Sequence, residues 1–93
     1  IIRRDIMAEK LFLELVTPEK AVVSEEVEMV TAPGTEGEFG VLKGHTTFLT
    51  SLRSGILRFK TAAGTEKAYQ VEGGFTEVLP DKVTVLAESA VEV

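Results

Sequence analysis

The stretch LFLELV, residues 11–16, decides the fold, because large apolar side chains recur in it at every second position. Successive side chains of an extended strand point to opposite faces, so Leu11, Leu13 and Leu15 share one face. Alternation of this kind sets one side of a strand against a core and the other toward water. We therefore predict a half-buried β-strand here.

The same two-residue period recurs in ILRFKT, residues 56–61, and in KVTVLAE, residues 82–88. The residues expected to share the core-facing sides of these two runs are Leu57, Phe59, Val83, Val85 and Ala87. In VEMVTA, residues 27–32, the same rule places Val27 and Met29 together. YQV and FTEVL continue the pattern as two further runs. The period of two thus predicts strands along most of the chain.

Turn-forming residues separate these runs. In LPDK, residues 79–82, Pro80 presets the first dihedral of a turn and Asp81 can bond to its own backbone. Gly55 and Gly64 are each expected to supply a positive φ. Short runs and turns at even spacing are typical of an all-β sandwich or barrel. We therefore predict an all-β domain.

Two stretches carry weak helical signals. In TPEKAVVSEE, residues 17–26, Thr17 could cap a helix that begins at Pro18, but no apolar stripe of helical period follows. In GHTTFLTSL, residues 44–52, the β-branched threonines favour an extended segment. The first stretch is therefore predicted to turn into a strand and the second to be extended.

Composition excludes several classes of function. The 93 residues suffice for one domain, expected over residues 7–93, with residues 1–6 as an artificial leader or an upstream extension before Met7. Ten Lys plus Arg against 15 Asp plus Glu give a net charge of -5, which disfavours nucleic acid as a partner. The absence of Cys excludes disulfides and thiol catalysis. No apolar run approaches the roughly 18 residues that span a membrane.

The glycine-rich stretch TAPGTEGEFGVLKGHTTFLT, residues 31–50, contains two acids and the single histidine of the chain. A phosphate-binding loop needs G-x-x-x-x-G-K-[ST], whereas Lys43 here precedes Gly44. Glu36 and Glu38 would also repel a polyphosphate. Because these acids lie among glycines, we expect them in an exposed loop that can meet a basic partner.

The residues give little support for an enzymatic function. His45 would need a nucleophile and an orienting acid gathered around it in space, and its neighbours along a strand point to opposite faces. One histidine without cysteine makes a poor zinc site. Nothing in the sequence shows the burial that a catalytic pair of carboxylates requires. We interpret His45 as a structural or interface residue and predict no catalytic, cofactor or metal site.

Large apolar residues crowd the middle of the chain. They are Phe39, Val41, Leu42, Phe48, Leu49, Leu52, Leu57 and Phe59. Burial in the core is the default for each. If several were exposed together, they would mark a contact with another protein.

Three stretches, VTAPGTEGEFGVLKGHTTFLTSLRSGILRF, YQVEGGFTEV and KVTVLAESA, together resemble the N-terminal domain of the epsilon subunit family of F-type ATP synthases. The shared features are an acid between glycines, a G-x-x-x-G-H, an apolar run, a Ser-Gly, a Gly-Gly and a closing VTVLA. In this sequence they are Glu38 between Gly37 and Gly40, Gly40 to His45, Phe48 and Leu49, Ser54-Gly55, Gly73-Gly74, and Val83 to Ala87. The resemblance covers about Leu11 to Ala90, nearly the whole chain.

The resemblance implies a flattened β-sandwich of about ten short strands. It also implies a non-catalytic subunit of the central stalk, coupling rotation of the gamma subunit to the membrane c-ring in proton-driven ATP synthesis. The alpha/beta hexamer would be an indirect partner, and the expected location is peripheral, at the cytoplasmic face of the bacterial inner membrane. Two sets of residues follow: a c-ring-contacting loop of Glu36, Gly37, Glu38 and Phe39, and gamma-facing positions Thr17, His45 and Thr50.

Family members in bacteria and chloroplasts continue into a C-terminal helical hairpin, which carries nucleotide binding and inhibition. The sequence stops at Val93, so neither property is expected of it, whether it is a truncated piece or a naturally short member. Two other functions stay open on the residues alone. One is a stand-alone ligand-binding sandwich, which would need a concave pocket with convergent polar groups, and the other is a small hydrolase using His45.

Overall fold

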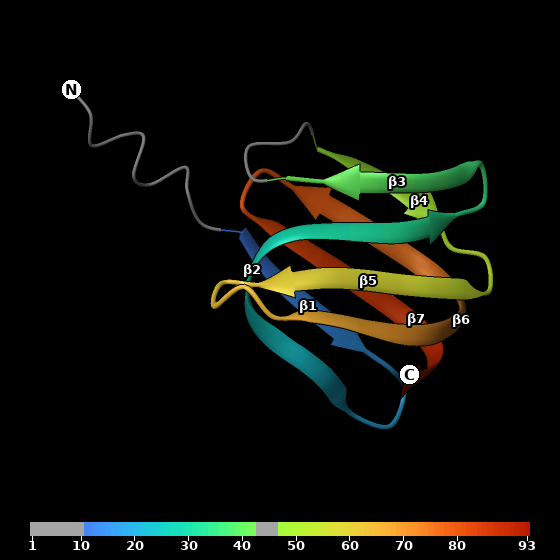
Figure 1. Ribbon diagram of the computed structural model, residues 1–93. Helices are drawn as coiled ribbons and strands as arrows, with labels where there is room; N and C mark the ends of the chain where they lie inside the picture. Colours follow the sequence, from blue (N-terminus) through green and yellow to red (C-terminus); the bar gives the residue numbers. More distant parts are fainter. Residues whose placement is uncertain (1–10, 43–46) are drawn as a thin grey trace.

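The computed structural model describes residues 11–42 and 47–93, and these residues form seven β-strands and no helix (Figure 1). The strands are β1 (Leu11–Val16), β2 (Ala21–Gly34), β3 (Gly37–Val41), β4 (Phe48–Ser51), β5 (Gly55–Thr61), β6 (Glu66–Leu79) and β7 (Lys82–Glu92). The predicted all-β fold is confirmed. The stretch after Thr17 bends and then enters β2, as the missing helical stripe predicts.

The strands form one sheet that closes on itself. Their hydrogen-bonded order is β1-β7-β6-β5-β2-β3, and β1 also pairs with β2, which completes the ring. The β1–β7 pairing is parallel and the others are antiparallel. In the described part of the chain, β3 pairs only with β2 and β4 only with β6, so both are edge strands.

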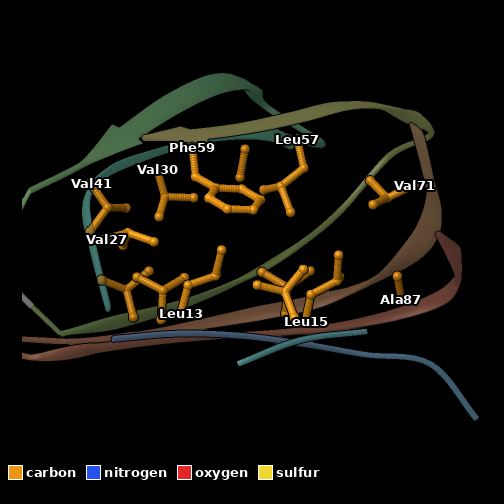
Figure 2. Packing of buried hydrophobic residues seen from close by; sticks show 14 of the residues in the cluster. Leu13, Leu15, Val27, Val30, Val41, Leu57, Phe59, Val71 and Ala87 are labelled. Atoms are coloured by element: carbon orange, nitrogen blue, oxygen red, sulfur yellow. The ribbon is translucent and has the colours of Figure 1, made fainter. Parts of the chain in front are cut away.

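The closed sheet is flattened into two layers with the core between them. Figure 2 shows Val30, Leu57 and Phe59 directed from one layer toward Leu13 and Leu15 of the other. All eight residues predicted to face the core from the runs at 11–16, 56–61 and 82–88 are buried. Each fully buried side chain of this size contributes about 1.5–3 kcal/mol. The fold therefore rests on the period of two.

The strand count is lower than the ten expected, because two long strands each serve both layers. β2 and β6 have 14 residues each. The runs YQV and FTEVL, predicted as separate, are the two halves of β6 on either side of Gly73 and Gly74. Both glycines have positive φ, 53° and 113°, so the strand bends from one layer into the other without ending.

Two predictions for single residues are wrong. Val27 and Met29 were expected on one face, but a β-bulge between them shifts the register, and Met29 is exposed. Gly55 lacks the positive φ that Gly64 has. Instead, a Cβ at Gly55 would lie 2.9 Å from Cβ of Pro33, so the glycine permits a close approach of two segments.

Candidate functional site

The predicted acidic loop is the tip of the β2–β3 hairpin, and we call residues 34–38 the acidic hairpin. Gly34 and Gly37 pair across the turn, and Gly37 has a φ of 129°. A Cβ at Gly34 would lie 2.9 Å from the Gly37 carbonyl oxygen and 3.0 Å from the Phe39 ring. The glycines thus close a tight turn that leaves Glu36 exposed at its tip.

The two acids of the hairpin differ in their surroundings. An oxygen of the Glu38 carboxylate lies 3.5 Å from the guanidinium of Arg58 on β5, and both side chains are more than half exposed. An exposed pair of this kind contributes about 0–1 kcal/mol. Glu36 makes no ion pair with any residue the structure describes. Among the described residues, the hairpin therefore presents one carboxylate without an ion pair, that of Glu36, and one partly compensated, that of Glu38.

Phe39, the fourth residue assigned to this loop, points away from the tip. It is half-buried, and its ring packs edge-on against Phe48 of β4 with centroids 5.3 Å apart. The contact joins the two edge strands, β3 and β4. Phe39 thus supports the acidic hairpin from behind and packs against the core.

Two of the three gamma-facing positions lie in the described residues, and His45 lies outside them. Thr17 follows β1, where its N–H donates to the Lys20 carbonyl at 2.9 Å and closes the turn into β2. Thr50 lies on β4, half-buried, directly opposite Thr76 of β6. Thr17 and Thr50 are thus at opposite sides of the layer formed by β1, β7, β6 and β4.

Between these two positions the outer surface of that layer carries a patch of apolar side chains, beside the Lys82–Glu14 ion pair at 3.1 Å. Phe75 of β6 and Leu86 of β7 are directly opposite each other, and Leu86 is also opposite Val16 of β1. Leu49 of β4 is directly opposite Glu77, two residues along β6 from Phe75, and so is a diagonal neighbour of Phe75. Leu49, Phe75 and Leu86 are 67%, 53% and 49% exposed. We call these four residues the apolar face.

The outer surface of the other layer carries two ion pairs, beside the exposed Met29 and Val93. Glu28 pairs with Lys60 at 3.8 Å, and the Glu38–Arg58 pair lies on the same surface. We call these four residues the charged face. A groove of about 500 Å³ crosses it, lined by Met29, Arg58, Lys60, Glu66, Lys67 and Glu92 among others. Charged side chains of both signs line the groove.

Tyr69 of β6 has a pKa raised above its usual value of 10.0. Burial is the largest cause, and the carboxylates of Glu92 and Glu25 add to it. Its ring stacks on Phe59, with centroids 6.0 Å apart. The phenol is neutral at neutral pH with or without this shift, so the raised pKa reports burial of the ring and no catalytic role. The described residues contain no cluster of three side chains that could hold a metal ion.

The comparisons with known proteins agree with this geometry. The family model for the ATP synthase, Delta/Epsilon chain, beta-sandwich domain matches residues 10–93. The chain belongs to this family. The resemblance read from the sequence is therefore confirmed, and so is the β-sandwich class.

Two sequence relatives and one solved structure are similar to this chain. The ATP synthase epsilon chain of Desulforapulum autotrophicum is 70% identical over 84 residues, covering 90% of this chain and 62% of that protein. The ATP synthase epsilon chain of Caulobacter vibrioides is 51% identical over 83 residues, covering 89% and 95%. The cryo-EM structure of the Euglena gracilis mitochondrial ATP synthase (OSCP/F1/c-ring) includes a chain with a TM-score of 0.85 and 30% identity, covering 90% and 54%. The chain thus spans 62% of the length of the first of these relatives.

Sequence reasoning missed two residues of the apolar face, Phe75 and Leu86, although the signal was present. In KVTVLAE, Leu86 is out of phase with the buried Val83 and Val85 and must point outward. In FTEVL, Phe75 is likewise out of phase with the buried residues at 76 and 78. A large apolar residue on the outward phase of a strand is the signal for a contact surface.

Proposed function

We propose that this family member is a non-catalytic subunit of the central stalk of an F-type ATP synthase, coupling rotation of the gamma subunit to the c-ring for proton-driven ATP synthesis. One observation carries the proposal: a single closed sheet exposes an apolar face on one layer and an acidic hairpin at its end. Two unlike surfaces held by one rigid sheet suit a protein that joins two different partners.

The apolar face is the surface we assign to the gamma subunit. Phe75 and Leu86 form an exposed apolar centre, which is typical of a protein contact site, and aromatic residues such as Phe75 are enriched in protein interfaces. The positions implied to face gamma, Thr17 and Thr50, lie in the segments on either side of this centre, but the side chain of Thr50 shares the core-facing side with the buried Thr76. We assign His45 to the same interface. Contact with the alpha/beta hexamer would then pass through gamma.

The acidic hairpin is the surface we assign to the c-ring. Glu36 and Glu38 would meet basic polar loops of the ring, Gly37 allows the turn, and Phe39 supports it from the core. This assignment places the protein peripherally, at the cytoplasmic face of a bacterial inner membrane. The role needs stiffness and no active site, and the closed sheet supplies the stiffness.

The test is charge reversal in the hairpin of the reconstituted ATP synthase. Glu38→Lys is expected to weaken docking on the ring and to lower ATP-driven proton pumping, while the protein stays folded because Glu38 is exposed. Glu66→Lys is the matched control, since Glu66 is also exposed but begins β6 opposite Lys60, near the end of β5 that is far from the hairpin. Unchanged proton pumping with Glu38→Lys would contradict the role given to the hairpin.

A further inference from the structure

The base of the acidic hairpin is held by the connection between β4 and β5. The Thr35 N–H donates to the Ser51 carbonyl at 3.0 Å, and the Arg53 N–H donates to the Pro33 carbonyl at 2.9 Å. Gly34 and Leu52 form an isolated β-bridge between these two bonds. The hairpin is thus clamped along one side by residues far away in sequence.

The side chain of Arg53 adds a bond that the backbone cannot supply. Its Nε donates to the Gly34 carbonyl at 3.1 Å in a partly buried position. Another guanidinium nitrogen lies 3.5 Å from the place that a Cβ of Gly55 would occupy, so the side chain lies against its own turn. One residue therefore binds two consecutive carbonyls, those of Pro33 and Gly34, just before the acids.

The same connection is also tied to the strand that carries the apolar face. The Leu52 N–H donates to the Gly74 carbonyl at 2.9 Å, and Ser54 Oγ donates to the Glu72 carboxylate at 2.7 Å. Gly74 directly precedes Phe75. The connection at residues 51–55 therefore bridges the acidic hairpin and the apolar face.

We propose that Arg53 is the positioning residue of the acidic hairpin. Its two bonds fix the direction in which Glu36 and Glu38 leave the sheet, and this direction sets their affinity for a cationic partner. The consequence for binding rests on the proposed function, whereas the effect on the hairpin itself does not. Arg58 has a different role, because it binds the Glu38 carboxylate and compensates charge.

Two substitutions separate the hydrogen bond of Arg53 from its charge. Arg53→Met and Arg53→Gln both remove one positive charge. The amide nitrogen of Gln stands at the same number of bonds from Cα as Nε of Arg, so Gln can still donate to the Gly34 carbonyl. Only the Met variant loses the donor.

The first measurement is amide hydrogen exchange of Thr35 in the full chain, followed by NMR. Loss of one such hydrogen bond is expected to speed exchange about 3- to 10-fold in Arg53→Met, while Arg53→Gln stays within about 2-fold of the parent chain. Exchange at Val85, in the core, should not change in either variant. Equal exchange of Thr35 in the Met variant and the parent chain would overturn the proposal.

The second measurement is binding to detergent-solubilised c-ring carrying the gamma subunit. Arg53→Met is expected to bind about 10-fold more weakly, and Arg53→Gln close to the parent affinity. If Arg53 acted only through its charge, both variants would bind a cationic ring more tightly, and the positioning role would be wrong. If the parent chain did not bind the ring at all, the proposed function would be wrong. The amide hydrogen exchange of Thr35 would still decide whether Arg53 positions the hairpin.

Discussion

The two outer surfaces of the flattened sheet obey the same rule of alternation but differ in which side chains dominate. Each carries both kinds, since the Lys82–Glu14 ion pair lies beside the apolar face and Met29 is exposed on the charged layer. On one layer the outward positions hold Leu49, Phe75 and Leu86. On the other they hold the Glu28–Lys60 and Glu38–Arg58 pairs. The fold requires only that outward residues tolerate exposure, so the fold itself does not explain why one surface is apolar. We propose that a partner covers one side and solvent the other.

The energies of the two surfaces support this interpretation. Burying one large apolar side chain yields about 1.5–3 kcal/mol, whereas an exposed ion pair contributes about 0–1 kcal/mol. The apolar face therefore retains binding energy that folding has not used. The charged face has already paired its charges within the chain.

The largest expected effect comes from breaking the bend through which β6 passes from one layer into the other. A Cβ at Gly74 would lie 1.8 Å from the Leu86 carbonyl oxygen, at a φ of 113°. Gly74→Ala should therefore lower the free energy of unfolding by about 4 kcal/mol or prevent folding. Chemical denaturation measures this loss.

Gly64→Ala is the control for that substitution. Gly64 also has a positive φ, 93°, but nothing lies within 4 Å of the added Cβ. It should cost only about 1–2 kcal/mol, from backbone strain alone. Equal losses in the two variants would show that the close approach at Gly74 is unimportant.

The next effect contrasts the two surfaces directly. Phe75→Asp should weaken binding to purified gamma subunit about 30-fold, as expected of a central aromatic contact. Met29→Asp places the same charge on the other layer, at a residue of similar exposure, and should change affinity less than about 2-fold. Isothermal titration calorimetry measures both. Similar losses at the two positions would remove the distinction between the surfaces.

Much of this arrangement was readable from the sequence, and the exceptions have physical causes. The leucines of β1 and the valines of β7 fall on the predicted faces, because a regular strand allows only two choices. Met29 fails because a bulge breaks the period, and the sequence shows no sign of it. Gly55 fails because close packing on Pro33, not its own φ, requires glycine there.

The candidate site was predictable only in part. The acids among glycines were recognised as an exposed loop, since that property is local. The clamp by Arg53 depends on a contact between segments 19 residues apart, which no local pattern encodes. The ion pair between Glu38 and Arg58 is a contact of the same kind, since it joins two different strands.

The smallest expected effect concerns Tyr69 of β6, which is half-buried and stacks on Phe59 of β5. Its folded pKa is raised above the unfolded value of about 10, chiefly by burial, with Glu92 and Glu25 adding to the shift. The stability this provides is fully present below pH 10 and is lost as the pH rises through the folded pKa. The ultraviolet absorbance of the phenolate reports this pKa cleanly, because the chain has one tyrosine.

The control for Tyr69 is Tyr69→Phe, which keeps the ring and cannot ionise. The difference in unfolding free energy between the two proteins should change only above about pH 10, in the direction that weakens the parent chain. A midpoint of the phenol titration at or below 10 would contradict the burial of Tyr69.

The central claim is that one layer of the sheet binds the gamma subunit and the other does not. Methyl NMR of the chain titrated with purified gamma subunit tests it most directly, since Leu49 and Leu86 report on the apolar face and Met29 on the charged layer. The account predicts that the methyl signals of Leu49 and Leu86 shift or broaden while that of Met29 stays in place. A change at Met29 with none at Leu49 and Leu86 would contradict it.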